Sequence, residues 1–549
     1  MAHGRPGASA ATATTNRVRD VSPFSGMCVV CEEGCPGLCE VGRSAYRGRE
    51  VIYPQPFGRA TAASQKDYPV DFSHLTILGE TLYTEGIEDG KETIFPNVKI
   101  ETELGGIRLK NPIVISAMGS TEVARRNWEG LAGGAAISGC IAIVGENVCG
   151  MDMDAEWDRI NNKVVRSPDM EFRIRAFRDW HDGYGEIGVQ LNPHDAEFGV
   201  GEYVASKLEV DLIEIKRGQG AKDIGGEVKV DSLEKALELK KRGYFVYPDP
   251  EDREVQEAYR SGVLKAFERH SKTPQFTREG FLELVDRLRS LGVRHISFKD
   301  GPYRPFDIAY ALRLGAMADL SFMTFDGAGG GTGMSPWRMM NEWGIPTYYL
   351  ESLIHGLCCF FECERMLIAP PLVIAGGITL EDHVVKALSL GAPYVRAVGM
   401  SRAPLAAVMV AKTLVKQMKE KNWSASLGGP SRSLGGSGVN SIDSRVSPES
   451  IFVTAQVLKE KYGQDYNRLV ETGAIGVYTY IQDRLATGIR QLLCGLRKFD
   501  IGLLSRDDVA ALTKEAEDVA NYYPKGVKPA GFKPLRFVTD VDLERIAKL

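Results

Sequence analysis

The central part of the chain alternates short apolar runs with longer segments whose apolar residues recur at helical spacing. Each apolar run has the length of a strand, and most end at small or polar residues. The runs are 111–116, 141–145, 187–191, 211–216, 295–299, the start of 321–336, 372–378 and 394–401. Eight strands separated by helices over one continuous stretch are typical of a (β/α)8 TIM barrel in the α/β class.

The last three runs each lead into a loop rich in glycine. Residues 321–336, SFMTFDGAGGGTGMSP, crowd five glycines around Asp326 and Thr332, and LVIAGGI and YVRAVGMS repeat the same format. Glycine lets the backbone approach a flat or phosphorylated ligand and adopt positive φ angles. One such loop is also explained by surface flexibility. Three in succession predict a ligand at one face of the barrel.

The pattern divides the chain into four parts. We predict a disordered lead-in over residues 1–25 and an extension with clustered cysteines over 26–106, which wraps the main domain. The barrel is predicted over 107–420. A Gly/Ser-rich link and C-terminal helices are expected over 421–549, with helices near 448–462 and 477–496.

Composition narrows the functional classes. The 549 residues are 44% hydrophobic and 25% charged, with a net charge of −5 and both signs mixed along the chain. This balance favours a globular protein and argues against a nucleic-acid or membrane surface. No apolar run is long enough to span a bilayer, and the N-terminus has no apolar secretion segment. We therefore expect a cytoplasmic protein.

Ten cysteines in a reducing compartment more often bind metal than pair with one another. Cys28, Cys31, Cys35 and Cys39 form a compact C-x2-C-x3-C-P-x2-C set. A proline after the third cysteine is found in many ferredoxin-like sites, so an iron–sulfur cluster of the [4Fe-4S] type is the favoured prediction. Zinc and unligated thiols remain alternatives. Cys358, Cys359 and Cys363 lie in an apolar helical pattern and are predicted to be core thiols; recruitment of Cys358 and Cys363 to a cluster is the alternative.

Several segments resemble glutamate synthases. Residues 199–226, GVGEYVASKLEVDLIEIKRGQGAKDIGG, are similar to the segment that ends in that family's QGAKPGEGG loop. FDGAGGGTGMSP resembles its DGGTGASP loop, and GENVCG stands where the family has NTGEGG. Residues 489–507 look like the helix that follows the family's barrel. The resemblance covers roughly residues 107–512 and implies the FMN-binding domain of glutamate synthase, which reduces 2-iminoglutarate to glutamate beside an iron–sulfur cluster.

Residues for FMN follow from the glycine loops and the resemblance together. Backbone N–H groups at glycine turns suit a phosphate, and small residues after the first strand let a ring lie flat on the backbone. The resemblance places a lysine at the polar edge of the flavin, where Lys299 ends an apolar strand; a buried ion pair is the alternative. The predicted cofactor-binding residues are Ser116, Ala117, Met118, Gly119, Lys299, Asp326, Gly327, Gly330, Gly376, Gly377, Gly399 and Met400.

The predicted catalytic and substrate-binding residues are Lys222, Glu227 and Glu146. Lys222 matches the lysine of the QGAK loop, which in the family holds the carboxylates of the 2-oxo acid; a solvated loop lysine is the alternative. Glu227 departs from the family, which has glutamine near this place. Glu146 is a loop carboxylate that could orient substrate or move protons, or merely cap a helix.

The expected activity is an FMN- and iron–sulfur-dependent reductive amination of 2-oxoglutarate. The family's cluster cysteines after the eighth strand are absent from residues 401–404, so the N-terminal four are expected to replace them. No glutaminase domain is recognised, so ammonia would come from a partner amidotransferase subunit, free ammonium or an amine. Ferredoxin or a reductase subunit would donate electrons, and a homo-oligomer is expected. A methylglutamate-synthase-type or other amino-acid oxidoreductase, or an electron-transfer subunit, remains an alternative.

Overall fold

A closed barrel of eight parallel strands forms the centre of the molecule. The computed structural model describes residues 40–521, apart from 56–57, 59–60, 275–276, 333, 365–366 and 421–446. In hydrogen-bonded order the strands are β4 (Ile113–Met118), β5 (Ile141–Val144), β8 (Ile187–Leu191), β9 (Leu212–Lys216), β13 (His295–Asp300), β14 (Phe322–Asp326), β15 (Leu372–Ala375) and β16 (Val395–Met400). β16 pairs with β4 and closes the ring. The predicted (β/α)8 fold and its eight strands are confirmed.

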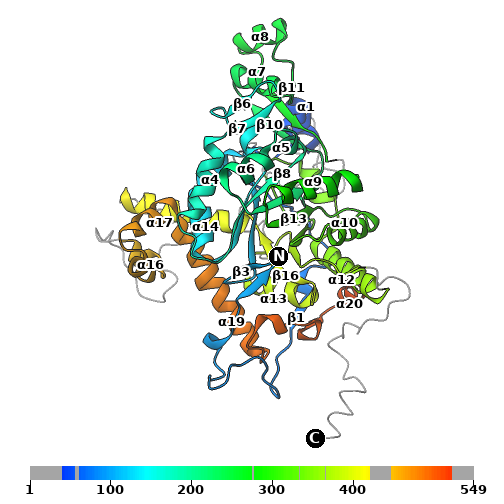
Figure 1. The fold of residues 1–549 in the computed structure, drawn as a ribbon, viewed down its shortest axis with the longest axis vertical. Helices are drawn as coiled ribbons and strands as arrows, with labels where there is room; N and C mark the ends of the chain where they lie inside the picture. Colours follow the sequence, from blue (N-terminus) through cyan, green and yellow to red (C-terminus); the bar gives the residue numbers. More distant parts are fainter. Residues whose placement is uncertain are drawn as a thin grey trace, which may run out of the picture.

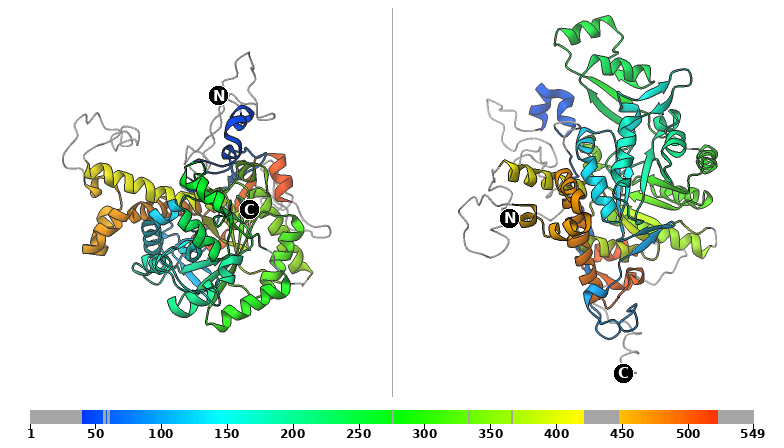
Figure 2. Two further views of the ribbon diagram at one scale, coloured as in Figure 1. Left: turned by 90° about the horizontal axis from the view of Figure 1, so that it is seen from above. Right: turned by 60° about the vertical axis from the view of Figure 1, so that its left-hand side comes forward.

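Helices lie around the barrel (Figures 1 and 2). The main ones are α2 (Glu122–Ile137), α4 (Pro168–Arg178), α6 (Val200–Leu208), α9 (Arg278–Ser290), α10 (Pro305–Met317), α12 (Thr347–Cys363), α13 (Glu381–Leu390) and α14 (Arg402–Lys419). Several begin at a Ser or Thr that accepts a hydrogen bond from a backbone N–H in the first turn, as Thr121 does from Ala124 and Ser167 from Met170. Such caps satisfy donors that the helix itself leaves unpaired.

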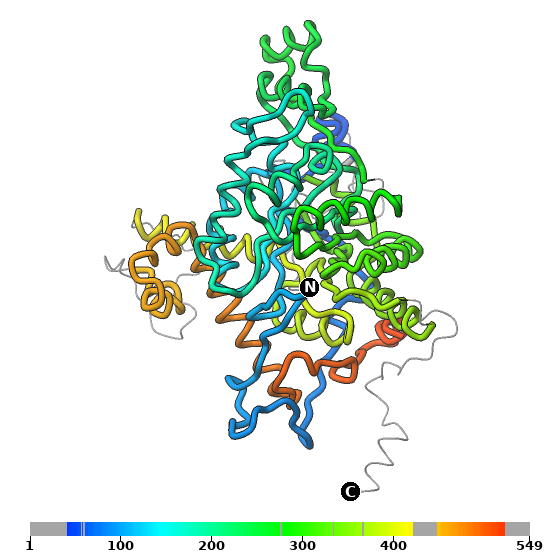
Figure 3. The backbone as a smooth tube through the Cα atoms, in the orientation of Figure 1, coloured from blue at the N-terminus to red at the C-terminus, as the bar shows by residue number. Residues whose placement is uncertain are grey.

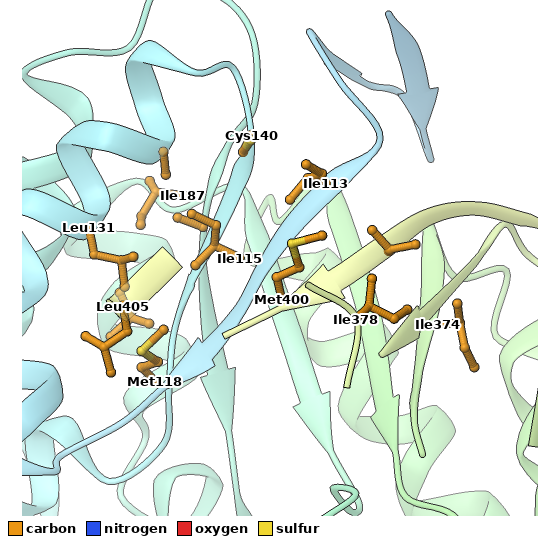
Figure 4. Packing of buried hydrophobic residues seen from close by; sticks show 14 of the residues in the cluster. Ile113, Ile115, Met118, Leu131, Cys140, Ile187, Ile374, Ile378, Met400 and Leu405 are labelled. Atoms are coloured by element: carbon orange, nitrogen blue, oxygen red, sulfur yellow. The ribbon is translucent and has the colours of Figure 1, made fainter. Parts of the chain in front are cut away.

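Side chains on the outer surface of the strands pack against these helices. Figure 4 shows Ile113 and Ile115 of β4 in one apolar layer with Met400 of β16 and Leu131 of α2. Alternate residues of the same strands face inward. Val114 accordingly belongs to a separate cluster inside the barrel.

A hairpin closes the barrel at the amino ends of its strands. β2 (Thr102–Leu104) pairs antiparallel with β3 (Ile107–Leu109). Leu104, Ile107 and Leu109 are buried in one cluster with residues near the strand starts: Val114, Ile141, Ile143, Leu212, Phe322, Val373 and Ala397. The hairpin therefore completes the apolar half of the barrel interior.

A small antiparallel sheet is inserted between β9 and β13. Its strand order is β10 (Gly226–Val230), β12 (Phe267–Ser271) and β11 (Phe245–Tyr247), with α7 (Leu233–Lys241) and α8 (Arg253–Arg260) in the connections. It stands at the top of the molecule in Figure 1, beside α1 (Glu40–Arg47). This sheet is missing from the sequence-based prediction, which places only barrel strands and helices between residues 107 and 420.

Residues 75–99 and 498–511 lie side by side at the end of the molecule opposite the inserted sheet (Figure 3). β1 (Leu75–Ile77) pairs antiparallel with β17 (Val509–Ala511), and isolated bridges join Glu85 to Lys498 and Lys99 to Asp500. These pairings tie the N-terminal segment to the chain that follows the last long helix.

The C-terminal helices pack on the helices that surround the barrel, with their main contacts on α2, α13 and α14. They include α16 (Ala455–Tyr462), α18 (Ala474–Tyr478), a π-helix (Thr479–Leu485) and α19 (Ala486–Gly495). A Cβ added to Gly134 of α2 would lie 2.4 Å from the Cβ of Val477 in α18, so glycine permits this approach. The helix predicted at 477–496 is confirmed in position but contains this π-helical turn. In the described part of the chain, no helix is both long and apolar enough to cross a membrane.

Shortening Leu104 should destabilise the barrel. Its side chain is 0% exposed in the β2–β3 hairpin, which we call the plug because it closes the barrel. Leu104→Ala therefore removes buried surface and leaves a cavity, costing about 2–5 kcal/mol of unfolding free energy. Denaturant unfolding measures this. Leu82→Ala is the matched control, because Leu82 is 68% exposed and should cost little; equal effects of the two variants would contradict the plug.

Candidate functional site

Two adjoining cavities open at the carboxyl ends of the barrel strands. They share Asp326, Gly331, Ser401 and Arg402 and so form one continuous cleft. The first, the glycine cavity, is lined by residues that follow β14 and β15 or that end β16: Gly329, Gly330, Gly376, Gly377, Gly399 and Met400, with Ser116 of β4. The second, the lysine cavity, lies between the barrel and the inserted sheet and includes Ala117, Met118, Gly119, Glu146, Asn147, Lys222, Gly226, Val228, Arg269 and Lys299.

Backbone geometry at the glycine cavity requires glycine. Gly376 and Gly377 have φ angles of +114° and +83°, which side chains disfavour. A Cβ on Gly376 would lie 2.5 Å from Thr347 Oγ1, whereas one on Gly377 would have only Gly329 O within 4 Å, at 3.7 Å. The space beyond Gly377 therefore belongs to the cavity.

The loop after β14 also depends on glycine. A Cβ on Gly327 would lie 2.4 Å from Thr347 Oγ1, and one on Gly330 would lie 3.3 Å from Asp326 Oδ1. Gly330 and Asp326 line the glycine cavity, while Gly327 packs beneath it against α12. The structure thus brings the predicted glycines together, but Gly327 does not itself line the glycine cavity.

Arg402 lines both cavities and was not among the predicted site residues. It is the first residue of α14 and its Nε donates to Thr61 Oγ1 at 3.0 Å. Burial lowers the pKa of its guanidinium to about 10. A cation at a helix N-terminus is repelled by the positive end of the helix dipole. An arginine in this place, directly after a glycine loop, therefore indicates that an anion binds nearby, and this pattern is the signal in the sequence that could have identified Arg402.

Lys299 projects into the polar upper layer of the barrel. Its Nζ lies 3.4 Å from Asp326 Oδ2. Burial would lower the pKa of Lys299, but the carboxylates of Asp326 and Glu214 outweigh this and raise it. The ion pair considered from the sequence is therefore present, and Lys299 lines the lysine cavity as well. Two buried hydroxyl oxygens in this layer, Ser116 Oγ and Thr324 Oγ1, have no partner among the described residues.

The loop that ends β4 is held rigidly. Gly145 N donates to Met118 O at 2.8 Å, and the buried Arg173 donates from Nη1 to the carbonyls of Met118 and Gly119 at 3.3 and 3.0 Å. A Cβ on Gly119 would lie 2.5 Å from Glu146 O. Gly119 is therefore needed for packing against the next loop. Ala117, Met118 and Gly119 form a fixed floor of the lysine cavity.

Glu146 is bound to a neighbouring lysine. Lys216 Nζ lies 2.5 Å from Glu146 Oε1 and 2.8 Å from Gln219 Oε1. Burial would raise the pKa of Glu146, but the charge of Lys216 outweighs it and lowers the pKa to about 2. Glu146 is thus ionised at neutral pH, which suits orientation of a donor better than delivery of a proton.

Lys222 is buried in the cavity wall. Only 7% of the residue is exposed, and Nζ donates to Met334 O at 3.0 Å. Burial and the nearby charge of Lys216 lower its pKa to about 8. The alternative of a solvated loop lysine does not describe this environment.

Glu227 lies on the other side of the inserted sheet. Successive residues of a strand face opposite sides, and the cavity is lined by Gly226 and Val228. Glu227 instead accepts a hydrogen bond from the hydroxyl of Tyr53. Its predicted role in catalysis therefore has no support from direct contact with the cavity.

Arg269, on β12, was missed by the sequence analysis. It is fully buried and lines the lysine cavity. Register places it opposite Val228, and Ser271 opposite Gly226, so these four residues share one face of the sheet. Its Nη1 donates to Ser271 Oγ and lies 3.4 Å from Asn147 Oδ1.

A buried polar network supports Asn147. This residue adopts a left-handed conformation with φ of 65°, and its Oδ1 accepts from Asn192 Nδ2 at 3.0 Å. Asp195 Oδ2 accepts from the backbone N–H groups of Asn147 and Asn192 at 3.0 and 3.3 Å. Burial raises the pKa of Asp195 to about 7.

The four N-terminal cysteines, Cys28, Cys31, Cys35 and Cys39, lie outside the described residues, so their metal-binding role stays a prediction. Within the described ranges, no group of three or more His, Cys, Asp or Glu side chains could hold a metal ion. Cys358 is buried, as predicted for a core thiol. Cys363 is exposed, which corrects its prediction as a core residue, because it lies at the end of α12.

The fold is a TIM barrel with a polar cleft at the carboxyl ends of its strands. Residues 275–415 match the conserved region in glutamate synthase. This range holds β13 to β16, every residue of the glycine cavity except Ser116, Lys299 and most of α14. The match confirms the resemblance to that family. No curated protein matches the chain.

Solved structures that can be superposed on this one include the flavin-binding domain of baker's yeast flavocytochrome b2. It is 13% identical over 84% of this chain and 80% of that chain, with a TM-score of 0.43. A mutant of an active chimera of (S)-mandelate dehydrogenase is 14% identical over 80% and 88%, with a TM-score of 0.42. These values are too low to bear on function.

Replacing Asp195 should change how stability depends on pH. Its pKa is about 7 when folded against about 3.9 in an unfolded chain, so ionisation of the buried carboxyl costs stability progressively as pH rises from 4 to 7. Asp195→Asn removes that cost. The stability of the variant relative to the wild type, measured from melting temperatures across this range, should therefore increase with pH by up to about 4 kcal/mol. A difference that is constant with pH would contradict the raised pKa.

Proposed function

We propose that this protein is an FMN-dependent oxidoreductase of the glutamate synthase type. The observation that carries the proposal is the coincidence of the family match at 275–415 with the glycine cavity and Lys299. Flavin enzymes need a phosphate grip, a flat surface for the ring and a charge near its polar edge, and this cleft contains residues suited to each.

The residues fit FMN on structural grounds. The turn at Gly376-Gly377 and the end of β16 at Gly399-Met400, with Arg402, would hold the phosphate. The rigid floor at 117–119 would support the ring, and Lys299 would meet its polar edge. The hydroxyl of Ser116, which has no partner among the described residues, lines the glycine cavity. Bound FMN supplies hydride transfer.

The substrate would lie in the lysine cavity. Lys222 presents a buried positive charge to a carboxylate, and ionised Glu146 with Lys216 can orient an amine or imine group. These residues favour reductive amination of 2-oxoglutarate to glutamate. The proposal retains an iron–sulfur cluster on Cys28, Cys31, Cys35 and Cys39, fed by ferredoxin or a reductase subunit, and ammonia from a partner amidotransferase or from solution.

Adding a side chain at Gly377 should remove the flavin. In Gly377→Val the new side chain projects toward the glycine cavity from a backbone at φ of +83°, so FMN released on denaturation should fall to a small fraction of the wild-type amount. Gly292→Val is the control, since Gly292 has φ of +90° and open space around it. It should carry similar strain and retain FMN. Wild-type protein that releases FAD, or no flavin when purified anaerobically, would overturn the proposal.

Removing the charge of Lys222 should weaken 2-oxoglutarate use. A hydrogen bond to a charged group contributes about 1.5–3 kcal/mol, so Lys222→Met should raise the apparent KM roughly ten- to a hundredfold with FMN content unchanged. Wild-type affinity should also fall as pH rises above about 8, where Lys222 loses its proton, and the variant should lack this fall. Lys235→Met, which changes a half-buried lysine outside the cavity, is the control. An unchanged KM in Lys222→Met would refute the assignment.

A further inference from the structure

A short N-terminal segment is built into the rim of the cleft. This segment, residues 61–66, is called the strap below. Ala63 forms an isolated antiparallel bridge with Gly331 in the loop after β14. Ala62 belongs to a small apolar cluster with Ala221, Trp337 and Met340. The strap therefore joins the loops that follow β9 and β14, although it precedes the whole barrel in the sequence.

The strap holds two of the four residues at which the two cavities meet. The glycine cavity and the lysine cavity share Asp326, Gly331, Ser401 and Arg402. A Cβ added to Gly331 would lie 2.0 Å from Ala62 O, so the strap is in close contact with this loop. Arg402 donates from Nε to Thr61 Oγ1 at 3.0 Å, and Thr61 itself lines the lysine cavity. A ligand that extends from one cavity into the other therefore lies next to the strap.

Two polar groups of the strap bind the same buried side chain. Asn341 belongs to α11 (Trp337–Glu342) and is 3% exposed. Its Oδ1 accepts from the backbone N–H of Gln65 at 2.6 Å and from Ser64 Oγ at 3.3 Å. Asn341 is not part of the described lining of either cavity. Any effect of Asn341 on a ligand is therefore transmitted through the strap.

The strap buries little apolar surface. Its buried apolar residues are two alanines, and the cluster around Ala62 is separate from the main core. Ser64 N donates to Gly330 O over a long 3.4 Å. Lys66 pairs with Glu342 at the surface, where ion pairs contribute little. Segments with few buried apolar contacts open at a low free-energy cost, so the strap can open while the barrel stays folded.

We propose that the strap is a gate for FMN. It closes beside the junction of the two cavities when Asn341 holds Ser64 and Gln65, and it opens to let the flavin enter or leave. The identity of the ligand rests on the proposed function. The bond to Gln65 belongs to the closed strap whether the cleft is filled or empty, so weakening it lowers the barrier in both directions and leaves the affinity nearly unchanged. A residue that binds the flavin directly would instead change the affinity.

The test measures flavin release and flavin binding as separate rates. Release from the holoprotein is followed by the rise in flavin fluorescence after dilution, and rebinding to the same protein is followed by its quenching. Asn341→Ala removes the acceptor and should raise both rates roughly two- to tenfold, the effect of losing about one hydrogen bond. The dissociation constant should change little. Asn341→Asp retains an acceptor oxygen and should return both rates close to those of the wild type.

Asn111→Ala is the matched control. Asn111 is also a buried asparagine, and its side chain binds Ser138 O and Cys140 Sγ. It precedes β4 at the amino ends of the strands and is not part of the described lining of either cavity. This variant should lower stability without changing either rate. Hydrogen exchange at the Gln65 amide is a second measurement, and it should become faster in Asn341→Ala but not in Asn111→Ala.

The outcomes separate the gate from the proposed function. Unchanged rates in Asn341→Ala, faster release without faster binding, or equal changes in Asn111→Ala would overturn the gate while flavin binding stands. A wild type that binds no FMN would refute the proposed function. In that case the exchange of the Gln65 amide still tests the strap: faster exchange in Asn341→Ala supports opening at Asn341, and unchanged exchange refutes it.

Discussion

Charge burial at the carboxyl ends of the strands is the constraint on which the cleft depends. Desolvation of an ion is offset only when its partners are held in good geometry. Lys216 with Glu146 and Lys299 with Asp326 join side chains from different strand ends or loops, so the loops cannot move independently without separating buried charges. The close packing of Gly119 on the Glu146 backbone and the hold of Arg173 on Met118 and Gly119 serve the same end.

The strand period sets where those charges lie. Along β9, Leu212 belongs to the apolar cluster inside the barrel, and Glu214 and Lys216 follow at intervals of two residues. The interior therefore changes from apolar near the hairpin plug to charged at the cleft. The β2–β3 hairpin and the pairing of residues 75–99 with 498–511 bury apolar side chains at the end of the molecule away from the cleft. Apolar burial there stabilises the fold, whereas the buried ion pairs beside the cleft contribute little net free energy of folding.

The barrel could be predicted from sequence because its strands are continuous apolar runs bounded by loops, and the β8 prediction has the observed bounds. The inserted sheet could not, because FERHS in β12 has a single apolar residue and forms a strand only through its pairing with β10. Arg269 has no local signal for the same reason. Glu227 was misplaced because one step along a strand reverses the face, although its neighbour Gly226 does line the cavity. The cysteine motif at 28–39 lies beyond the described residues.

The buried cations that form ion pairs and those that contact only neutral groups lie in different parts of the fold. Lys216 and Lys299 lie on barrel strands and find carboxylates within the protein, so the barrel keeps its charge balance without a ligand. Lys222 and Arg269 lie on the loop and sheet inserted after β9, and their described partners are neutral: a carbonyl, a hydroxyl, an amide and an aromatic ring. Neutral partners orient a cation while leaving its charge uncompensated, so an incoming anion gains more there than at a paired site. The insertion could then change to suit another anion while the charge pairs that hold the barrel loops stay in place.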